Sequence, residues 1–172
     1  MATTDANGIV FLEETDPIAP FQTTINTLQQ GTSDAIGGLG SWRNYTPVLS
    51  TPTGSPTLGS GGSLVGRYTR IGNTVIGRVI LTLGTGFSPG SGSIRISLPA
   101  NSVASQFIGD ARIRVSNTYT RAQVISQGPH AILRYYDAAV NGNTPDVSLS
   151  ASNPGVFAAG DQIHAEFTYE VA

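Results

Sequence analysis

Apolar and polar residues alternate one by one along most of the chain after Trp42. The clearest case is the last segment, where the apolar positions between 163 and 171 alternate with His164, Glu166, Thr168 and Glu170. Successive side chains of a strand point to opposite faces, so this pattern predicts strands with one buried and one solvent-exposed face. The same alternation predicts strands within 93–98, 110–116, 123–127, 131–136 and 146–150.

Turn residues separate these segments. The dipeptide Gly72-Asn73 lies between two strand-like runs, 66–71 and 74–83, and predicts a tight hairpin. Gly occurs 21 times and Pro 10 times, a content that suits many short connections between strands. We therefore predict that residues 41–172 form a mainly β head domain, an antiparallel β-sandwich of the jelly-roll-like kind.

One segment, 17–40, has helical periodicity instead. Its apolar side chains recur in steps of three and four residues and form a narrow seam, which predicts one short α-helix. A helix of this length is marginal in water by itself. It can dock on its own domain or associate with other copies, and we favour self-association into a short coiled coil. The seam consists of Ile18, Phe21, Ile25, Leu28, Ala35 and Leu39.

The first 16 residues form a third segment, which we predict to be a strand or an extended arm. It holds the apolar tetrad Ile9, Val10, Phe11 and Leu12, followed by acidic residues. The chain thus divides into an arm (1–16), a helical neck (17–40) and a head (41–172).

The strand predicted after Gly72-Asn73 differs from the others because both of its faces carry apolar residues. Val75 and Val79 can face the core, whereas Ile76 and Ile80 lie on the opposite face. We expect this second face to be covered by a neighbouring subunit, so Ile76 and Ile80 are candidate oligomerisation residues.

Composition excludes several classes of function. All nine basic residues are Arg, and the net charge of -2 leaves no basic excess for nucleic-acid binding. The absence of Cys excludes disulfides and thiolate metal sites. No apolar run is long enough for a membrane span, so membrane insertion is not expected.

A search for catalytic motifs predicts a protein that is not an enzyme and has no cofactor or metal. The G-x-S-x-G match at 86–90 places Pro89 where a nucleophile elbow needs a backbone N–H. Neither His130 nor His164 has metal-ligand spacing, and we expect turn-forming roles for Asp in loops. Glu166 and Glu170 stand about 13 Å apart along one strand, too far for a glycosidase pair.

Aromatic residues near loops are candidates for ligand binding. Tyr119, Tyr135 and Tyr136 combine a flat apolar ring with a polar group, which suits contacts with sugars or proteins. The simpler alternative for the adjacent pair is that one ring belongs to the core and the other only extends to solvent.

Motif spacing links the chain to a known group of proteins. Trp42, Tyr45, Thr46 and Pro47, then Gly66, Tyr68, Gly72 and Val75, and finally Gly90-Ser91-Gly92 before Ser97-Leu98-Pro99 follow one pattern. This pattern, W-x-x-Y-T-P … G-x-Y-x-x-x-G-x-x-V … G-x-G … S-L-P, resembles the head domain of tail-associated proteins of phages that infect actinobacteria. The resemblance extends over most of the chain from Gly8.

The resemblance implies a virion protein of the minor tail or fibre kind, made in the host cytoplasm. Such proteins look like homotrimers with a virion-anchoring arm, here Ile9 to Leu12, a helical neck and a head that meets a host surface glycan or protein. Two alternatives remain. One is a capsid decoration or head-fibre protein on the shell, and the other is a monomeric sugar-binding protein unrelated to virions.

Overall fold

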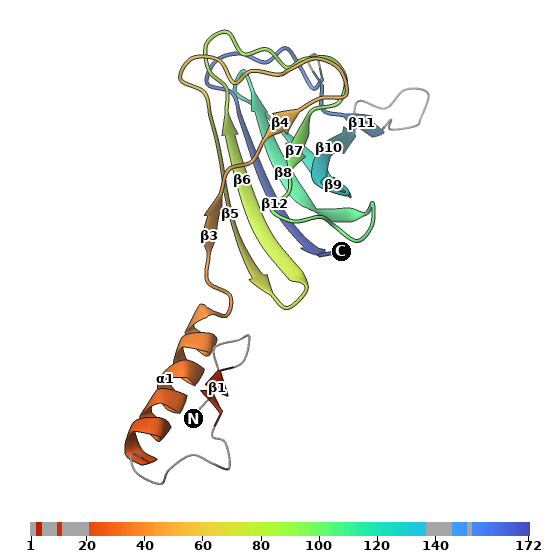
Figure 1. Ribbon diagram of the computed structural model, residues 1–172. Helices are drawn as coiled ribbons and strands as arrows, with labels where there is room; N and C mark the ends of the chain where they lie inside the picture. Colours follow the sequence, from red (N-terminus) through yellow and green to blue (C-terminus); the bar gives the residue numbers. More distant parts are fainter. Residues whose placement is uncertain (1–2, 5–9, 12–20, 137–145, 151–152) are drawn as a thin grey trace. The chain divides into compact units, whose positions relative to one another are not determined.

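The computed structural model describes residues 3–4, 10–11, 21–136, 146–150 and 153–172. Its elements are β1 (Thr3–Thr4), β2 (Val10–Phe11), α1 (Phe21–Gly38), β3 (Arg43–Tyr45), β4 (Leu49–Ser50), β5 (Ser63–Ile71), β6 (Thr74–Thr82), β7 (Arg95–Ser97), β8 (Phe107–Val115), β9 (Thr118–Gln127), β10 (His130–Tyr136), β11 (Asp146–Ser148) and β12 (Gln162–Glu170) (Figure 1). The chain divides into two compact units, Met1–Ser41 and Trp42–Ala172.

The first unit contains the helix and a small hairpin. β1 and β2 pair in antiparallel fashion, with Thr4 opposite Val10. α1 begins directly after Pro20 and ends in a turn, in which the N–H of Leu39 donates to the carbonyl of Ile36 at 3.0 Å. Gly40 follows with a φ of 76°, a left-handed conformation that terminates helices at little cost when the residue is Gly. Among the described residues, no helix combines the length and hydropathy of a membrane span.

The second unit is one continuous, curled antiparallel sheet. Its hydrogen-bonded order is β3-β5-β6-β12-β8-β9-β10-β7-β4, and β11 pairs with the remaining part of β10. The predicted hairpin is present, because β5 ends at Ile71 and β6 begins at Thr74. The mainly β, antiparallel prediction is confirmed. The predicted jelly-roll-like sandwich of two separate sheets is not confirmed, because hydrogen bonds connect all the strands of this unit into one sheet.

The two ends of this sheet belong to neighbouring stretches of chain. β3 and β4 stand at opposite ends of the strand order, yet only residues 46–48 separate them. Four residue steps span at most about 14 Å, so the sheet must curl until its ends approach one another. Pro47 is buried, and Val48 exchanges two hydrogen bonds with Ser97, from its N–H to Oγ at 2.8 Å and from the Ser97 N–H to its carbonyl at 2.9 Å. This segment bridges the opening of the curl.

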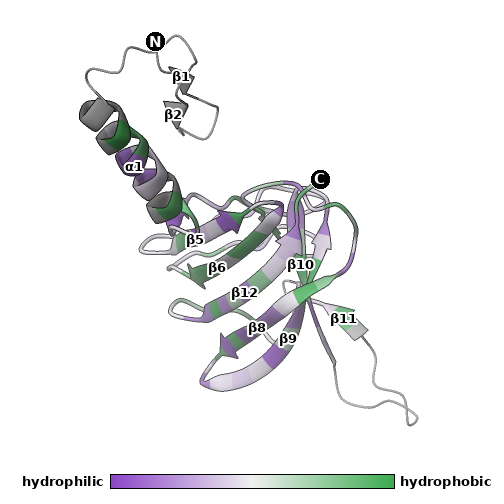
Figure 2. Cartoon of the chain, turned by 90° about the horizontal axis from the view of Figure 1, so that it is seen from below, coloured by the Kyte–Doolittle hydropathy of each residue, from purple (hydrophilic) through white to green (hydrophobic). Residues whose placement is uncertain are grey.

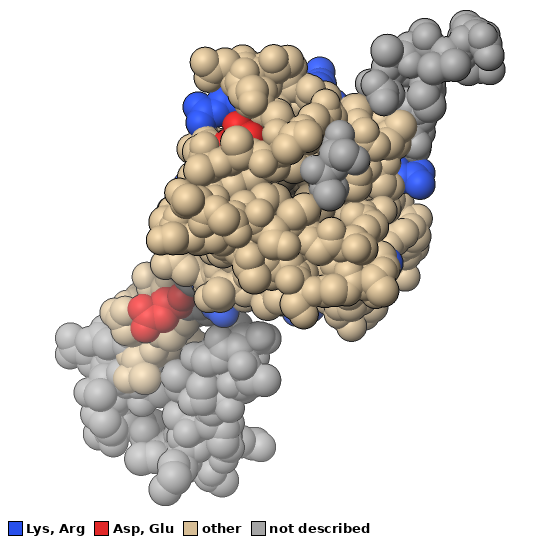
Figure 3. Space-filling model, turned by 90° about the horizontal axis from the view of Figure 1, so that it is seen from above, with Lys and Arg blue, Asp and Glu red and all other residues tan. Residues whose placement is uncertain are grey.

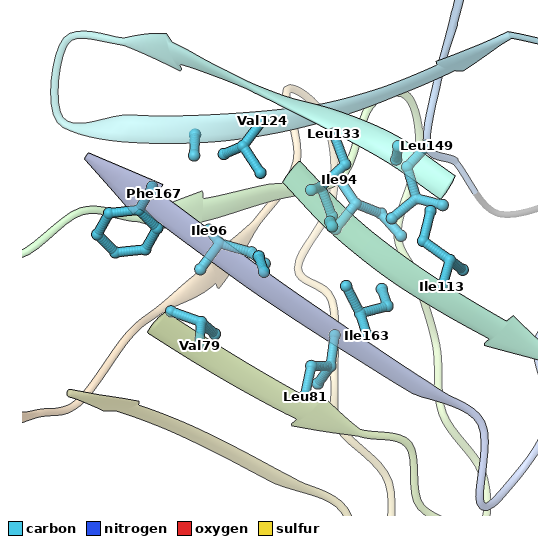
Figure 4. Packing of buried hydrophobic residues seen from close by; sticks show 14 of the residues in the cluster. Val79, Leu81, Ile94, Ile96, Ile113, Val124, Leu133, Leu149, Ile163 and Phe167 are labelled. Carbon is cyan, nitrogen blue, oxygen red and sulfur yellow. The ribbon is translucent and has the colours of Figure 1, made fainter. Parts of the chain in front are cut away.

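The core fills the concave side of the sheet (Figure 4). It draws on inward-facing positions of β6, β12, β8, β9, β10 and β7, with Leu149 adding a further side chain. In Figure 2 the bands of opposite hydropathy along these strands mark the same alternation. The largest fully buried side chains are Leu81, Leu83, Ile94, Ile113, Leu133, Leu149, Ile163, Val75, Val79 and Val124.

Candidate functional site

Charged side chains of β8, β9 and β12 share the outer, convex face of the sheet. Register places His164 opposite Arg112, and Arg112 opposite Arg121 on the next strand. One pleat further along, Glu166 lies opposite Asp110. Because residues two apart on a strand share a face, these five side chains form two adjacent rows across three strands. We call them the cationic row (Arg112 and Arg121, with His164 at its end) and the acidic row (Glu166 and Asp110).

The two rows line a groove of about 620 Å³. The residues around it are Asp110, Ala111, Arg112, Tyr119, Thr120, Arg121, His164 and Glu166. In contrast, the face shown in Figure 3 is almost entirely uncharged, with Arg side chains mainly at its margins. The groove brings two Arg, two acidic residues, His164 and an exposed Tyr together, and we take it as the candidate site.

Contacts within the groove orient its side chains. Arg121 Nε lies 3.4 Å from Asp110 Oδ1, an ion pair between exposed groups that contributes little to stability. The guanidinium carbon of Arg112 lies 5.1 Å from the centre of the Tyr119 ring, within the range of a cation–π interaction. His164 Nε2 is shielded from solvent and has no hydrogen-bond partner among the described residues.

The chemistry available in this groove is that of polar recognition. Arg and His donate hydrogen bonds, the two carboxylates accept them, and the Tyr119 ring is 59% exposed. The Asp110 and Glu166 carboxylates face open solvent, whereas acid catalysis by a carboxyl group relies on surroundings that exclude water. Within the described part of the chain, no three His, Asp or Glu side chains are placed to hold a metal ion.

Of the three Tyr residues predicted to bind a ligand, only Tyr119 is found in the groove. Tyr135 is 3% exposed and belongs to the core, so its prediction as a surface contact is wrong. The reason is its inward position on β10, two residues from the buried Leu133. The side chain of Tyr136 lies outside the described residues.

A second surface lies on the outer face of β5 and β6. The predicted contact residues are found there, with Ile76 exposed at 38% and Ile80 half-buried. Val65, directly opposite Ile80, and Ile71 are further exposed apolar side chains that the sequence reasoning missed, although their spacing on β5 could have revealed them. Trp42 also borders this face, with its ring 5.9 Å from the Arg67 guanidinium and 5.7 Å from that of Arg78.

The structure describes the side chains of only some residues of the predicted helix seam. Ile25 and Leu28 are half-buried, while Leu39 lies beyond the end of α1 and is 65% exposed. Ile36, which the heptad pattern left out of the seam, is 66% exposed. Ile18, Ile9 and Leu12 lie outside the described residues, as do the side chains of Phe21, Ala35, Val10 and Phe11.

Other motifs prove structural. Ser88 of the G-x-S-x-G match exchanges two backbone hydrogen bonds with Thr57, at 2.8 and 3.1 Å, in a ribbon of two loops. Asp161 is buried, and its carboxylate accepts the N–H of Ser116 at 3.0 Å and that of Ala158 at 2.8 Å. The bond to Ala158 closes the turn before β12, as expected for a turn-forming Asp, and the bond to Ser116 ties that turn to the one between β8 and β9.

Comparison with known proteins adds one similar structure. No protein-family model matches the chain, and no curated protein matches it. A solved structure similar to it is the crystal structure of the Dettilon tailspike protein (gp208), with a TM-score of 0.48 and 19% sequence identity. The match covers 77% of this chain and 24% of that chain, so the chain spans about a quarter of the tailspike's length.

Proposed function

We propose that this chain is a tail-associated phage virion protein that contacts the host cell surface and does not act as an enzyme. The observation that carries the proposal is the placement of the residues on which the resemblance rests. Tyr45 stands opposite Gly66 between β3 and β5, and its ring meets that of Tyr68 edge to face at a centroid distance of 5.7 Å. Pro47 is buried in the link that bridges the sheet ends.

These motif residues act together in one structural task, the closure of the curled sheet. At Gly66 a Cβ atom would collide with the Tyr45 ring, so the glycine and the tyrosine of the motif depend on each other. A spacing that specifies how a sheet closes is a stronger sign of a shared head domain than scattered identities are. The actinobacterial host stays a prediction.

Assembly follows from apolar surface that the chain does not cover itself. Ile36 and Leu39 are exposed at the end of the helical segment, and Val65, Ile71 and Ile76 are exposed on the outer face of β5 and β6. Arg67 and Arg78 lie between the Val65–Ile80 pair and Ile76, so the apolar side chains are grouped around two Arg rather than continuous. Exposed apolar side chains gathered on one face favour association. In this proposal the protein is a homotrimer, its arm binds other virion proteins, and the rest of its sheet unit, including the groove on β8, β9 and β12, remains free for the host surface.

Immunoelectron microscopy of intact particles tests the location. Antibodies against residues 42–172 should label the tail, with none of the label on the capsid. Label confined to the capsid shell would contradict the proposal and favour the decoration or head-fibre alternative. Antibodies against a known capsid protein and a known tail protein of the same particle provide the two controls.

A further inference from the structure

We propose that the groove on the outer face of β8, β9 and β12 binds an acidic sugar, a pyranose that carries a carboxylate. This inference rests on the proposed role in host contact and names the chemical class of the ligand. It is drawn from the two charged rows, which the Arg121–Asp110 ion pair joins at one end, from the stacked Arg112 and from the exposed ring of Tyr119.

The cationic row provides the subsite for the carboxylate. Arg112 lies between His164 and Arg121 in register, with no acidic side chain at these three positions. Its guanidinium is held over the Tyr119 ring at 5.1 Å, which limits its freedom before a ligand arrives. A planar guanidinium binds a carboxylate through two parallel hydrogen bonds.

A third Arg side chain near the groove does not take part. Arg114 is the next outward-facing residue of β8, but its Nη2 donates to the carbonyl oxygen of Gly160. This hydrogen bond holds the Arg114 side chain against the loop before β12. Arg121 is paired with Asp110, so the groove offers Arg112 as the guanidinium that can receive the carboxylate.

The acidic row suits the hydroxyl groups of a sugar. Two residues along a strand correspond to about 7 Å, so Asp110 and Glu166 lie one sugar ring away from the cationic row. Carboxylates accept hydrogen bonds from hydroxyl donors, and Asp110 is already oriented by Arg121 at 3.4 Å. The exposed part of the Tyr119 ring can pack against the C–H face of the sugar.

The same charges argue against other anionic ligands. A polyphosphate would place several negative charges across both rows, and those beside Asp110 and Glu166 would be repelled. A neutral sugar would leave the guanidinium of Arg112 without its counter-charge. A ligand with one carboxylate and several hydroxyl groups matches both rows at once.

The test uses the full chain and a matched pair of probes, an oligomer of galacturonic acid and its fully methyl-esterified form. Isothermal titration calorimetry should show that the acid binds and that the neutral ester binds at least about ten-fold more weakly. Binding of the acid should weaken as salt is raised, because its carboxylate is paired at an exposed surface. Tripolyphosphate should bind more weakly than the acid.

Variants then locate the binding. Arg112→Gln and Tyr119→Ala should each weaken binding of the acid about ten-fold, whereas Tyr119→Phe should retain it. Arg43→Gln is the matched control, since Arg43 is exposed on β3 outside the groove and loses the same charge. Thermal unfolding of each variant should match that of the wild type, because the substituted groups lie at the surface.

Three results would overturn the inference: no binding of the acid, equal binding of acid and ester, or equal losses for Arg112→Gln and Arg43→Gln. Tighter binding of tripolyphosphate would also overturn it. None of these results bears on where antibodies label the particle, so the sugar class can fail while the tail location stands.

Discussion

Buried phenol groups are the residues that link this fold most directly to pH. Burial raises the pKa of Tyr169 to about 12, and burial also raises that of Tyr45, with the neighbouring Tyr169 adding to the effect. The hydroxyl of Tyr169 donates to the carbonyl of Ala100 at 2.8 Å and accepts its N–H at 3.2 Å. The neutral phenol is therefore the form that the folded chain stabilises.

Alkaline pH should unfold the protein through these groups. An unfolded Tyr ionises near pH 10, so the stability from Tyr169 is complete below about pH 10 and is lost as pH rises towards 12. Each such phenol lowers the free energy of unfolding by at most about 1.4 kcal/mol per pH unit in that window. Guanidinium unfolding curves at pH 8 to 12 measure this slope.

Tyr169→Phe should separate the two contributions. We expect it to lower the free energy of unfolding by about 1 kcal/mol at pH 8, since its bonds to Ala100 are lost. Its stability should then fall less steeply than that of the wild type above pH 10, with Tyr45 responsible for the remainder. An unchanged slope would show that Tyr169 does not titrate with unfolding.

Sequence reasoning at the residue scale succeeded where the information was local. The alternation around Ile163 and Phe167 assigned the buried face of β12 correctly, and Asp161 proved to be a turn residue. Sequence reasoning could not pair Glu166 with Asp110, because that pairing depends on the register between two strands whose paired positions are 56 residues apart in the chain. The candidate groove was for this reason invisible before the structure.

Elements were predicted best where their boundaries carry Gly or Pro. The turn between β5 and β6 was predicted at the correct two residues, and the helix predicted within 17–40 is α1, which begins at Phe21 and ends at Gly38. β9 begins at Thr118, five residues earlier than predicted, because Ser116 and Asn117 adopt positive φ angles of 48° and 68° without a glycine. The pairing order and the curl depend on long-range hydrogen bonds that no local pattern encodes.

Within β8, Gly109 lies at an irregularity in the pairing with β9. The register with β9 shifts between Phe107 and Gly109, and a Cβ atom at Gly109 would collide with the carbonyl oxygen of Glu166 on β12. Gly109→Ala should thus lower the free energy of unfolding by about 1–3 kcal/mol, as overpacking does elsewhere. Urea unfolding measures the loss.

Gly155→Ala is the comparison for that variant, because a Cβ there would meet only the Val115 side chain, at 3.3 Å. It should cost less than Gly109→Ala. Equal losses would mean that the close approach of β8 and β12 does not constrain the sheet.

At the scale of the whole molecule, the proposed self-association predicts an effect of substitutions in α1. Ile25→Ser together with Leu28→Ser removes two half-buried apolar side chains of α1 and should lower the mass measured by light scattering at a given concentration. Gln29→Ser with Gln30→Ser changes two exposed residues of the same helix and should leave the mass unchanged. If both pairs of substitutions leave it unchanged, the helix is not the element that joins the subunits.

Residues 46–48, which connect the two ends of the sheet, also affect how readily copies of the protein aggregate at high concentration. Strands at the ends of a sheet expose backbone groups that can recruit strands of other molecules, and very short terminal strands limit that hazard. Here the terminal strands β3 and β4 are three and two residues long and belong to a single stretch of chain. Copies at high local concentration would therefore find few free backbone edges at these two strands through which to aggregate.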